Sequence, residues 1–541
     1  MLSKKDQEKL RGNLFRHLDG IGTAPTAFIL HKKGVLSYLL DKKKCSLQAL
    51  ADHFQANEGY LNVALRILCS QGWLTQEVDN AEDNITFEVS DASETAFNYV
   101  HLYEDGVQLL EVSEQFHPKK FGVEAFQLLE HITKKYKNNY GIVLSEDANE
   151  KAIQEQVLKH IEGIMIGPAT VHLGMGRMFH KYFMETSFKP EEFHQEPESF
   201  KKLLDLFAYL NWFKEKNGTY EFTDIGLFYA KRASAYGVTV SYIPNFRKLE
   251  ALIFGNPTIL KNTAKGETEK HVDRAMNVWG SGGAHSGYFK VVDEIVIELF
   301  NKPIKEQPKG ILDMGCGNGA FIQHLFNVIE KQTLRGRMLD EYPLMLVGVD
   351  YNETALKITK ANLIRADIWA KVIWGDIGRP DLLAEDLETN YRIQLTDLLN
   401  VRTFLDHNRI WEPPKAVNPS RVSTSTGAFA FEGKRLNNNL VEESLLAHFK
   451  KWAPFVKQHG LLVIELHTVP PELVARNLGK TPATAYDATH GYSDQYIVEV
   501  SVFNAIMAEA GLYPETDKFR KFPNSDLATV TINLFKGTSA S

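Results

Sequence analysis

An acid and a run of glycines in the C-terminal half have the spacing of a binding site for a positively charged ligand. The run Gly315-Cys316-Gly317-Asn318-Gly319 follows the apolar segment Ile311-Leu312 and precedes a helical pattern that begins near Phe321. Glycines at this point allow a tight turn and let a ligand contact bare main chain at the start of a helix. Asp313 stands two residues before the first glycine. Its negative charge there attracts a cation and repels a pyrophosphate.

Two further acids follow the next two predicted strands. Asp350 ends the apolar strand 344–349, where a carboxylate can accept hydrogen bonds from both hydroxyls of a ribose. Asp376 follows the strand 371–374, where it can accept a hydrogen bond from an adenine amino group while Ile377 packs on the ring. The three acids together predict a site for a cationic nucleoside.

This order of acid, glycine run, acid and acid resembles that of class I S-adenosylmethionine-dependent methyltransferases. The resemblance implies that S-adenosylmethionine is the cofactor. The implied cofactor-binding residues are Asp313, Gly315, Gly317, Gly319, Asp350, Asp376 and Ile377. A dinucleotide-dependent oxidoreductase is the alternative, because Gly315, Gly317 and Ala320 also satisfy the dinucleotide pattern. That alternative requires an uncharged residue in place of Asp313 and a second phosphate contact.

From about residue 308, short apolar runs alternate with helical patterns, which predicts βαβ units and a mostly parallel sheet. The last run, 528–535, and the segment before it from Lys518 are expected to form an antiparallel hairpin. The predicted fold class is α/β, with a Rossmann-like class I methyltransferase core that has a seven-stranded, mostly parallel sheet. A large, mainly helical, winged-helix-like lid is predicted at the N-terminus.

A weak internal repeat supports the prediction of winged helices. An apolar helical stripe at Leu61, Leu65 and Leu68 precedes an alternating stretch at 85–89, and a second stripe in 200–210 precedes a similar stretch at 219–223. Helices followed by a small β-ribbon are typical of a winged helix. Neither copy has a basic recognition helix, so we expect packing or dimerisation rather than DNA binding. The first copy also resembles the N-terminal helical domain of small-molecule O-methyltransferases, which dimerises and helps to cover the substrate.

We expect four parts in the chain. The first winged-helix-like unit occupies 1–110, the helical connector and second winged-helix-like unit 111–240, and bridging helices 241–300. The S-adenosylmethionine-binding core occupies 301–541 and contains a substrate-side insertion at 395–440. In the bridge, the glycine pair of Ser281-Gly282-Gly283-Ala284-His285 predicts a turn or a loop that approaches a ligand.

The composition excludes several classes of partner. The chain has 541 residues, 44% of them hydrophobic and 24% charged, which is typical of a globular protein with several domains. A net charge of −7 argues against a nucleic-acid-binding surface. No apolar run approaches the roughly 20 residues that span a bilayer, and the charged N-terminus lacks the apolar segment of a secretory signal. We therefore expect a cytoplasmic protein without a membrane or nucleic-acid partner.

Two polar clusters that follow predicted strands are candidates for the methyl-acceptor site. They are Phe404-Leu405-Asp406-His407-Asn408-Arg409 and His490-Gly491-Tyr492-Ser493-Asp494-Gln495-Tyr496. With residues 271–274 and 281–285, they resemble the C-methyltransferase domains of bacterial polyketide synthases, especially those of loading modules. That resemblance implies α-methylation of a malonyl unit on an acyl carrier protein. Some of these domains carry one iron or manganese ion near the cofactor, so this ion is a candidate second cofactor.

A metal ion would suit this chemistry. Removing the α-proton beside a thioester is difficult at neutral pH, and a divalent ion that chelates both malonyl oxygens stabilises the enolate. Imidazole and carboxylate ligands with open positions suit iron or manganese. We expect His490, Gln495 and Asp406 as the ligands. In the metal-free alternative His490 is the general base, and His467, which follows the strand 461–466, is a second candidate base.

The sequence therefore predicts an S-adenosylmethionine-dependent methyltransferase, EC 2.1.1, that C-methylates a malonyl-type acyl thioester on an acyl carrier protein in polyketide biosynthesis. The first alternative is O- or N-methylation of a small-molecule metabolite, for which a histidine base suffices. The second is a regulatory protein that binds a partner or DNA through its winged helices. The oligomeric state stays open, because a helical N-terminal domain suits both a dimer and a monomer.

Overall fold

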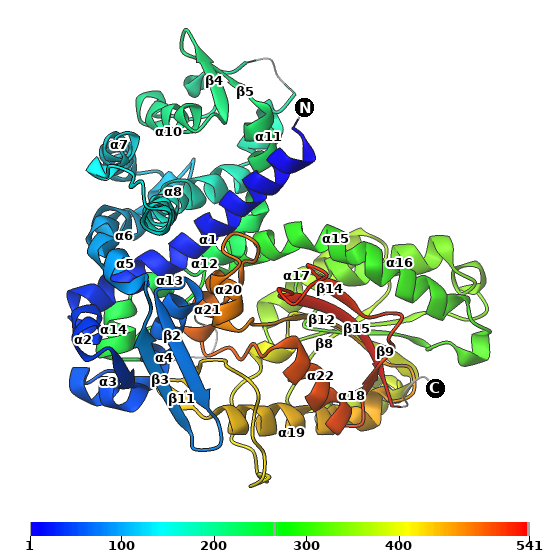
Figure 1. Cartoon of the computed structure of the whole chain (residues 1–541). Coiled ribbons are helices and arrows are strands. Elements are labelled where there is room, and N and C mark those ends of the chain that lie inside the picture. The colour runs from blue at the N-terminus through cyan, green and yellow to red at the C-terminus, as the bar shows by residue number, and fades with distance from the viewer. Residues whose placement is uncertain (1, 185–186, 263–266, 268, 538–541) are drawn as a thin grey trace. The chain divides into compact units, whose positions relative to one another are not determined.

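The computed structural model describes residues 2–184, 187–262, 267 and 269–537, with the backbone alone at 283–286 (Figure 1). The chain divides into two units. Unit 1 comprises Met1–His285, Ala428–Arg435 and Pro470–Asp494, and unit 2 comprises Ser286–Gly427, Leu436–Val469 and Gln495–Ser541. Among the described residues, no helix combines the length and the apolar character that crossing a membrane requires.

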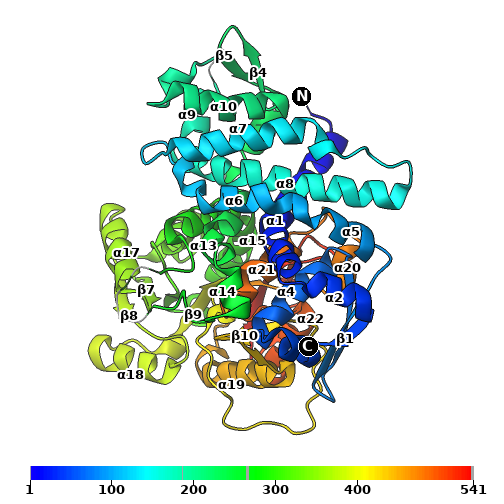
Figure 2. The same cartoon turned by 90° about the vertical axis from the view of Figure 1, so that its left-hand side faces the viewer.

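Two long helices, α1 (Lys4–Lys32) and α8 (Ala148–Met175), pack together in unit 1 (Figure 2). Their backbones approach closely at two glycines. A Cβ atom on Gly20 would lie 2.3 Å from His160 Cα, and one on Gly163 would lie 2.3 Å from the His17 carbonyl oxygen. Because these neighbours are main-chain atoms, a side chain at either glycine would push the two helices apart.

The first winged helix consists of two helices and a three-stranded sheet. Helices α3 (Leu47–Phe54) and α4 (Glu58–Ser70) accompany antiparallel strands in the order β1-β3-β2. The strands are β1 (Lys44–Ser46), β2 (Leu74–Asp79) and β3 (Asn84–Val89). The predicted apolar stripe lies on α4 and is fully buried.

The second winged helix repeats this pattern. Helix α10 (Pro197–Tyr209) precedes the antiparallel hairpin of β4 (Phe213–Lys216) and β5 (Thr219–Phe222). The remaining helices and strands of unit 1, with one pair that ends in unit 2, are α2 (Val35–Lys42), α5 (Ser93–Tyr99), α6 (Glu104–Glu111), α7 (Val123–Lys137), α9 (Met178–Tyr182), α11 (Asp224–Ala230), α12 (Gly237–Ser241), α13 (Ile243–Phe246), α14 (Leu249–Phe254), β10 (Phe429–Phe431), β11 (Lys434–Leu436), α20 (Pro471–Ala475) and α21 (Ala483–Gly491).

Helix α15 (Arg274–Asn301) corrects one prediction. The segment 281–285 was expected to be a turn or a ligand-approaching loop, and this is wrong because the backbone stays helical throughout it. Gly280, just before this segment, serves helix packing. A Cβ atom on Gly280 would lie 2.7 Å from Gly237 Cα on α12, whereas one on Gly282 would meet nothing within 4 Å. The side chain of His285 lies outside the described residues.

Unit 2 is built on one sheet in the order β8-β7-β6-β9-β12-β15, with β13 and β14 both paired to the outer side of β15 (Figure 1). The strands are β6 (Gly310–Met314), β7 (Met345–Asp350), β8 (Lys371–Trp374), β9 (Leu398–Thr403), β12 (Leu461–Leu466), β13 (Tyr513–Pro514), β14 (Arg520–Phe522) and β15 (Val530–Lys536). All pairs from β8 to β12 are parallel, and β15 is antiparallel to its neighbours. The strands occupy seven positions, which confirms the predicted α/β core with its closing antiparallel hairpin.

Helices cover both faces of this sheet. Helices α16 (Ala320–Gln332) and α17 (Glu353–Arg365) lie on one face, and α18 (Pro380–Tyr391), α19 (Asn438–Val456) and α22 (Val500–Glu509) lie on the other (Figure 1). The chain runs outward from β6 through β7 to β8 and then returns to β9 on the opposite side of β6. The carboxyl ends of β6 and β9 therefore border a topological switch point, where open α/β sheets bind their ligands.

The close approach of α1 and α8 makes a stability prediction. We expect Gly163→Ala to lower the melting temperature and the stability of unit 1, at a cost of about 1–3 kcal/mol, because the new methyl group overlaps the backbone of α1. Gly282→Ala is the matched control, since it places the same group in open space within a helix. Thermal unfolding followed by circular dichroism measures both variants. Equal melting temperatures for the two would contradict the prediction.

Candidate active site

The glycine run after β6 forms a tight loop that is bound to the neighbouring strand. Gly315, Gly317 and Gly319 have positive φ angles of 82°, 56° and 79°, a region that side chains disfavour. The backbone N–H groups of Gly315 and Cys316 both donate to the Val349 carbonyl of β7, at 2.8 Å and 3.0 Å. Gly319 is the residue before the first turn of α16. The loop therefore presents bare main chain at the start of a helix.

Two carboxylates lie at this loop. Asp350 accepts hydrogen bonds from the backbone N–H groups of Gly317 (3.0 Å) and Asn352 (2.8 Å). Asp313 is only 2% exposed, and its burial, together with the nearby charge of Asp350, raises its pKa to about 8. Within the described part of the chain, neither carboxylate forms an ion pair. Two neighbouring acids without a cation fit a positively charged ligand such as S-adenosylmethionine.

The third predicted acid lies one strand further along the same edge. Asp350 is paired in register with Trp374, and Asp376 follows two residues later, where its Oδ1 accepts from the Gly378 N–H (2.7 Å). Ile377 is buried and its carbonyl accepts from Trp452 Nε1–H (2.7 Å). The structure therefore places all seven predicted cofactor residues at the carboxyl ends of three adjacent strands. Their individual roles stay predictions.

Two aromatic residues at this edge were missed by the sequence analysis. Tyr351 and Trp374 are 58% and 50% exposed, and their ring centroids lie 5.5 Å apart. Trp374 Nε1–H also donates to the Tyr351 carbonyl oxygen (3.0 Å). The signal in the sequence is that each residue directly adjoins a predicted nucleoside-binding segment. Exposed aromatic faces near Asp376, the predicted adenine-binding acid, offer a stacking surface.

On the other side of the switch point, the cluster 404–409 lies against the glycine loop. A Cβ atom on Gly315 would lie 3.0 Å from Leu405 Cδ2. Phe404 has a φ of 55°, and its N–H donates to the Ile464 carbonyl oxygen (2.8 Å). A bulky residue in the left-handed region is an outlier that points to a functional constraint.

His407 in this cluster forms a buried pair with Glu465 of β12. Its Nδ1–H donates to Glu465 Oε1, and the His407 carbonyl accepts from the Tyr496 N–H (2.8 Å). A carboxylate on Nδ1 fixes the tautomer and makes Nε2 the basic nitrogen. His407 lies in a cluster that the sequence predicted to be functional, but no role was predicted for this residue. Its partner lies 58 residues away, and only the pairing of β9 with β12 brings the two together.

Asp406, a predicted metal ligand, is engaged in a buried ion-pair cluster. Its Oδ1 accepts from Arg402 Nη1–H and from His448 Nε2–H (2.8 Å). A metal ion at this carboxylate would compete with a guanidinium group. No three His, Cys, Asp or Glu side chains in the described ranges are arranged to hold a metal ion. The contacts of Asp406 therefore fit an ion pair better than a metal ligand, and the ion stays a prediction.

The other two predicted metal ligands belong to different units. Gln495 is buried in unit 2, and His490 is buried in helix α21 of unit 1. His490 Nδ1 lies 2.9 Å from both the Tyr486 carbonyl oxygen and Thr489 Oγ1. The helix itself is held by an ion pair between Arg66 Nε and Asp487 Oδ2 (3.0 Å). The role of His490 as a metal ligand or base stays a prediction.

His467, the second candidate base, is completely buried in unit 2. Its Nδ1 lies 3.1 Å from the Val498 carbonyl oxygen, and its Nε2 lies 2.7 Å from Thr531 Oγ1. Burial lowers its pKa to about 3, which makes it a poor base at neutral pH. These contacts favour a structural role for His467.

Three family models match the chain. The methyltransferase model described as the AprA MT2-like domain matches residues 269–533. The AprA winged helix domain matches residues 162–256, and the AprA N-terminal domain matches residues 10–76. The second match confirms the predicted winged helix of α10, β4 and β5. The comparison with curated proteins finds no match.

Solved structures of methyltransferases resemble the chain at low identity. The mitomycin 7-O-methyltransferase MmcR is 12% identical, with 72% of this chain and 99% of that one covered and a TM-score of 0.40. The CurJ carbon methyltransferase is 10% identical, with 86% and 100% covered and a TM-score of 0.33. The SAH-bound form of CalO1, a methyltransferase in calicheamicin biosynthesis, is 13% identical, with 73% and 100% covered and a TM-score of 0.38.

The AprA MT2-like match spans the glycine loop, all three acids and the His407–Glu465 pair. The sheet order, the switch point and the two acids at the glycine loop are consistent with the same class of enzyme. The chain is therefore an S-adenosylmethionine-dependent methyltransferase.

Proposed function

We propose that this methyltransferase methylates the α-carbon of a malonyl-type acyl thioester carried by an acyl carrier protein, with His407 as the general base. The observation that supports the base is the buried His407–Glu465 pair at the sheet edge that carries the glycine loop. The hypotheses of His490 as the base and of a bound metal ion stay open. A mechanism with His407 as the base requires no metal ion. The substrate class follows from the resemblance of the polar clusters to polyketide C-methyltransferase domains.

The residues act in a fixed order. S-adenosylmethionine supplies an electrophilic methyl group on a cationic sulfur. His407 Nε2 accepts the proton of the acceptor carbon, and the electron pair left behind attacks the methyl group. The new carbon–carbon bond forms as the methyl–sulfur bond breaks, and the sulfur keeps the electron pair of the broken bond, which leaves neutral S-adenosylhomocysteine. Glu465 stabilises the imidazolium that results, because its carboxylate stays hydrogen-bonded to Nδ1–H. Asp313 and Asp350 hold the positive charge of the cofactor at the glycine loop.

Methylation of a hydroxyl group on a small molecule is the second candidate function. The same His407–Glu465 pair supports it, because deprotonating a phenol requires only a positioned imidazole. The two functions therefore share the base and the cofactor residues and differ in the acceptor atom.

The raised pKa of Asp313 makes the affinity for S-adenosylmethionine depend on pH. Because its pKa is about 8, the carboxyl group of Asp313 is mostly protonated at lower pH. A cationic ligand binds best to the ionised form. Binding should therefore release a proton, and the affinity should rise between pH 6 and pH 8 and level off above. Calorimetry in buffers of different ionisation enthalpy measures the released proton. Asp313→Asn should abolish this dependence; an unchanged dependence in that variant would refute the assignment.

The assignment of His407 predicts a large loss of turnover without a loss of cofactor binding. We expect His407→Ala to reduce kcat by about 10²- to 10⁴-fold, the range for removal of a general base. Glu465→Gln should reduce kcat by a smaller factor. The affinity for S-adenosylhomocysteine should stay unchanged in both. His459→Gln is the control, since His459 precedes β12 at the opposite edge of the sheet. Full activity of His407→Ala would remove His407 from the mechanism.

Mass spectrometry tests the substrate class and the metal hypothesis together. After incubation with S-adenosylmethionine, malonyl-loaded carrier protein should gain the mass of one methylene group for each transfer. The iron and manganese content of the same protein and of His490→Ala should be measured in parallel. Metal-free enzyme with full activity would eliminate the metal ion. An unmodified carrier, together with methylation of a phenolic acceptor, would favour the second candidate function.

A further inference from the structure

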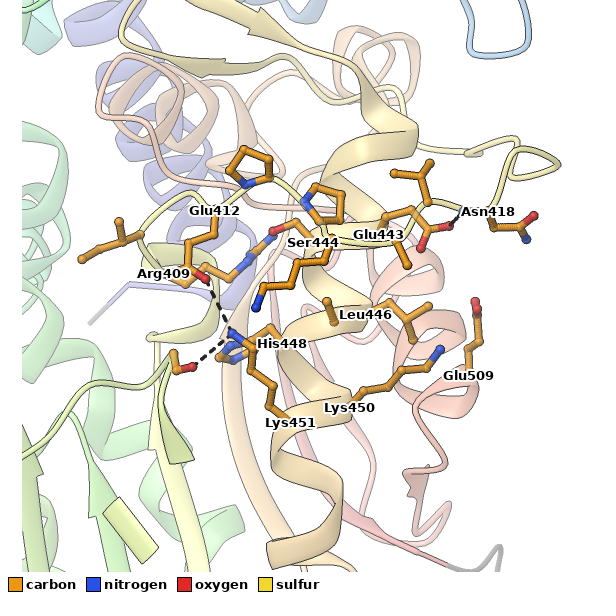
Figure 3. Close-up of a pocket in the computed structure, with 18 of the residues that line it drawn as sticks. Arg409, Glu412, Asn418, Glu443, Ser444, Leu446, His448, Lys450, Lys451 and Glu509 are labelled. Atoms are coloured by element: carbon orange, nitrogen blue, oxygen red, sulfur yellow. Dashed lines mark hydrogen bonds and ion pairs between the residues drawn. The ribbon is translucent and has the colours of Figure 1, made fainter. Parts of the chain in front are cut away.

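A cavity of about 680 Å³ lies in unit 2 between the loop 409–418 and helix α19 (Figure 3). Arg409 and Lys415 line it from the loop, and His448 and Lys450 line it from the helix. His448 donates to Asp406, the residue next to the proposed base. Asp376, a predicted cofactor residue, also lines the cavity. The cavity therefore borders a predicted cofactor residue, Asp376, and also His448, which contacts the neighbour of the proposed base.

Arg409 is a buried cation whose hydrogen-bond donors are only partly used. Its side chain is 5% exposed, Nη1–H donates to the Asp406 carbonyl oxygen (3.1 Å), and Nη2–H donates to the Val441 carbonyl oxygen (3.4 Å). Its Nε–H is buried without a partner among the described residues. Burial lowers the pKa of Arg409 to about 10, so the group stays charged at neutral pH. A buried charged donor without a partner indicates a missing ligand.

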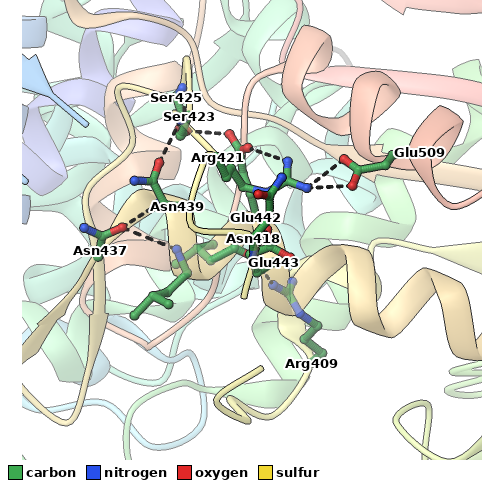
Figure 4. Close-up of polar contacts among 12 residues, drawn as sticks. Arg409, Asn418, Arg421, Ser423, Ser425, Asn437, Asn439, Glu442, Glu443 and Glu509 are labelled. Atoms are coloured by element: carbon green, nitrogen blue, oxygen red, sulfur yellow. Dashed lines mark hydrogen bonds and ion pairs between the residues drawn. The ribbon is translucent and has the colours of Figure 1, made fainter. Parts of the chain in front are cut away.

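Most acids that line the cavity are already neutralised. Arg421 binds Glu443 through Nε (2.6 Å) and Glu509 through Nη2 (2.7 Å), as Figure 4 shows. Glu412 lies 3.6 Å from Lys451. These pairs leave the cavity walls without the strong negative potential that their three carboxylates would otherwise produce.

Two further lysines remain for a ligand. Lys415 and Lys450 line the cavity, are solvent-exposed, and form no ion pair with the described side chains. They stand on opposite walls, one on the loop and one on α19. With Arg409 they provide three cationic donors around one space.

We propose that this cavity binds a phosphate group on the arm of the thioester substrate. The proposal rests on the proposed function, because it assumes a thioester acceptor. Arg409 Nε–H has no partner among the described residues, and Lys415 and Lys450 add two ammonium groups at the same cavity. One guanidinium N–H and two ammonium groups suit the several oxygens of a phosphate. The cavity volume also leaves room for the arm beside the phosphate.

The phosphate has two chemical sources. It can belong to the phosphopantetheine arm of a carrier protein or to a free coenzyme A thioester. Both present the same oxyanion next to the same flexible arm, and they differ in what lies beyond the phosphate.

Calorimetric titration with phosphopantetheine and with pantetheine, which lacks the phosphate, tests the cavity. The wild-type enzyme, saturated with S-adenosylhomocysteine, should bind phosphopantetheine at least about tenfold more tightly, as expected for a charge-assisted contact. Arg409→Met and the double variant Lys415→Met/Lys450→Met should lose most of this difference. Lys457→Met, just beyond the end of α19, should keep it.

The double variant alters only exposed side chains, so it tests the cavity even if Arg409→Met fails to fold. Equal affinities of the wild-type enzyme for the two probes, or an unchanged difference in the double variant, would overturn the proposal.

Steady-state kinetics separates the sources. If the double variant raises KM about tenfold for malonyl-loaded carrier protein alone, the phosphate belongs to the phosphopantetheine arm of the carrier. A rise for malonyl-coenzyme A alone assigns the free thioester. Unchanged KM values for both overturn the proposal. If neither thioester is methylated but phosphopantetheine still binds through Arg409, the proposed function fails and the cavity assignment stands.

Discussion

The structure of the catalytic core depends on one electrostatic arrangement, the two carboxylates Asp313 and Asp350 beside a loop of bare backbone. Burial of Asp313 next to a like charge is unfavourable in the protein alone, and its raised pKa records that cost. A cationic ligand removes the penalty. The surrounding features follow from this need, since left-handed glycines expose the main chain and Val349 holds the loop on β7.

The sheet topology then determines where the chemistry takes place. Because β9 returns beside β6, the cluster 404–409 lies against the glycine loop, with Leu405 in contact with Gly315. Because β12 pairs with β9, Glu465 reaches His407. The proposed base and the predicted cofactor site therefore lie at the same switch point.

Local sequence patterns predicted the parts of this site that are local. Asp313 and Asp350 lie at the carboxyl ends of β6 and β7, and the glycine run directly follows β6, so residue type and spacing were sufficient to place them. The His407–Glu465 pair was not predictable in this way, because its members are distant in sequence and only strand pairing joins them. The error at 281–285 has a related cause: a glycine pair favours a turn locally, but the residues on both sides continue one long helix, in which nearby Gly280 packs on Gly237.

Asp406 and its neighbour His407 make different contacts. Asp406 binds the buried charge of Arg402, whereas His407 pairs with Glu465. Arg402 packs on the ring of Trp452 and binds Asp406, which also accepts from His448. An isolated buried carboxylate would destabilise the core, whereas Asp406 accepts through Oδ1 from both Arg402 and His448. The cluster therefore anchors the turn at Asp406 from β9 and α19 at once. An anchored turn holds His407 in one orientation, and a general base acts only from a fixed position relative to the proton that it removes.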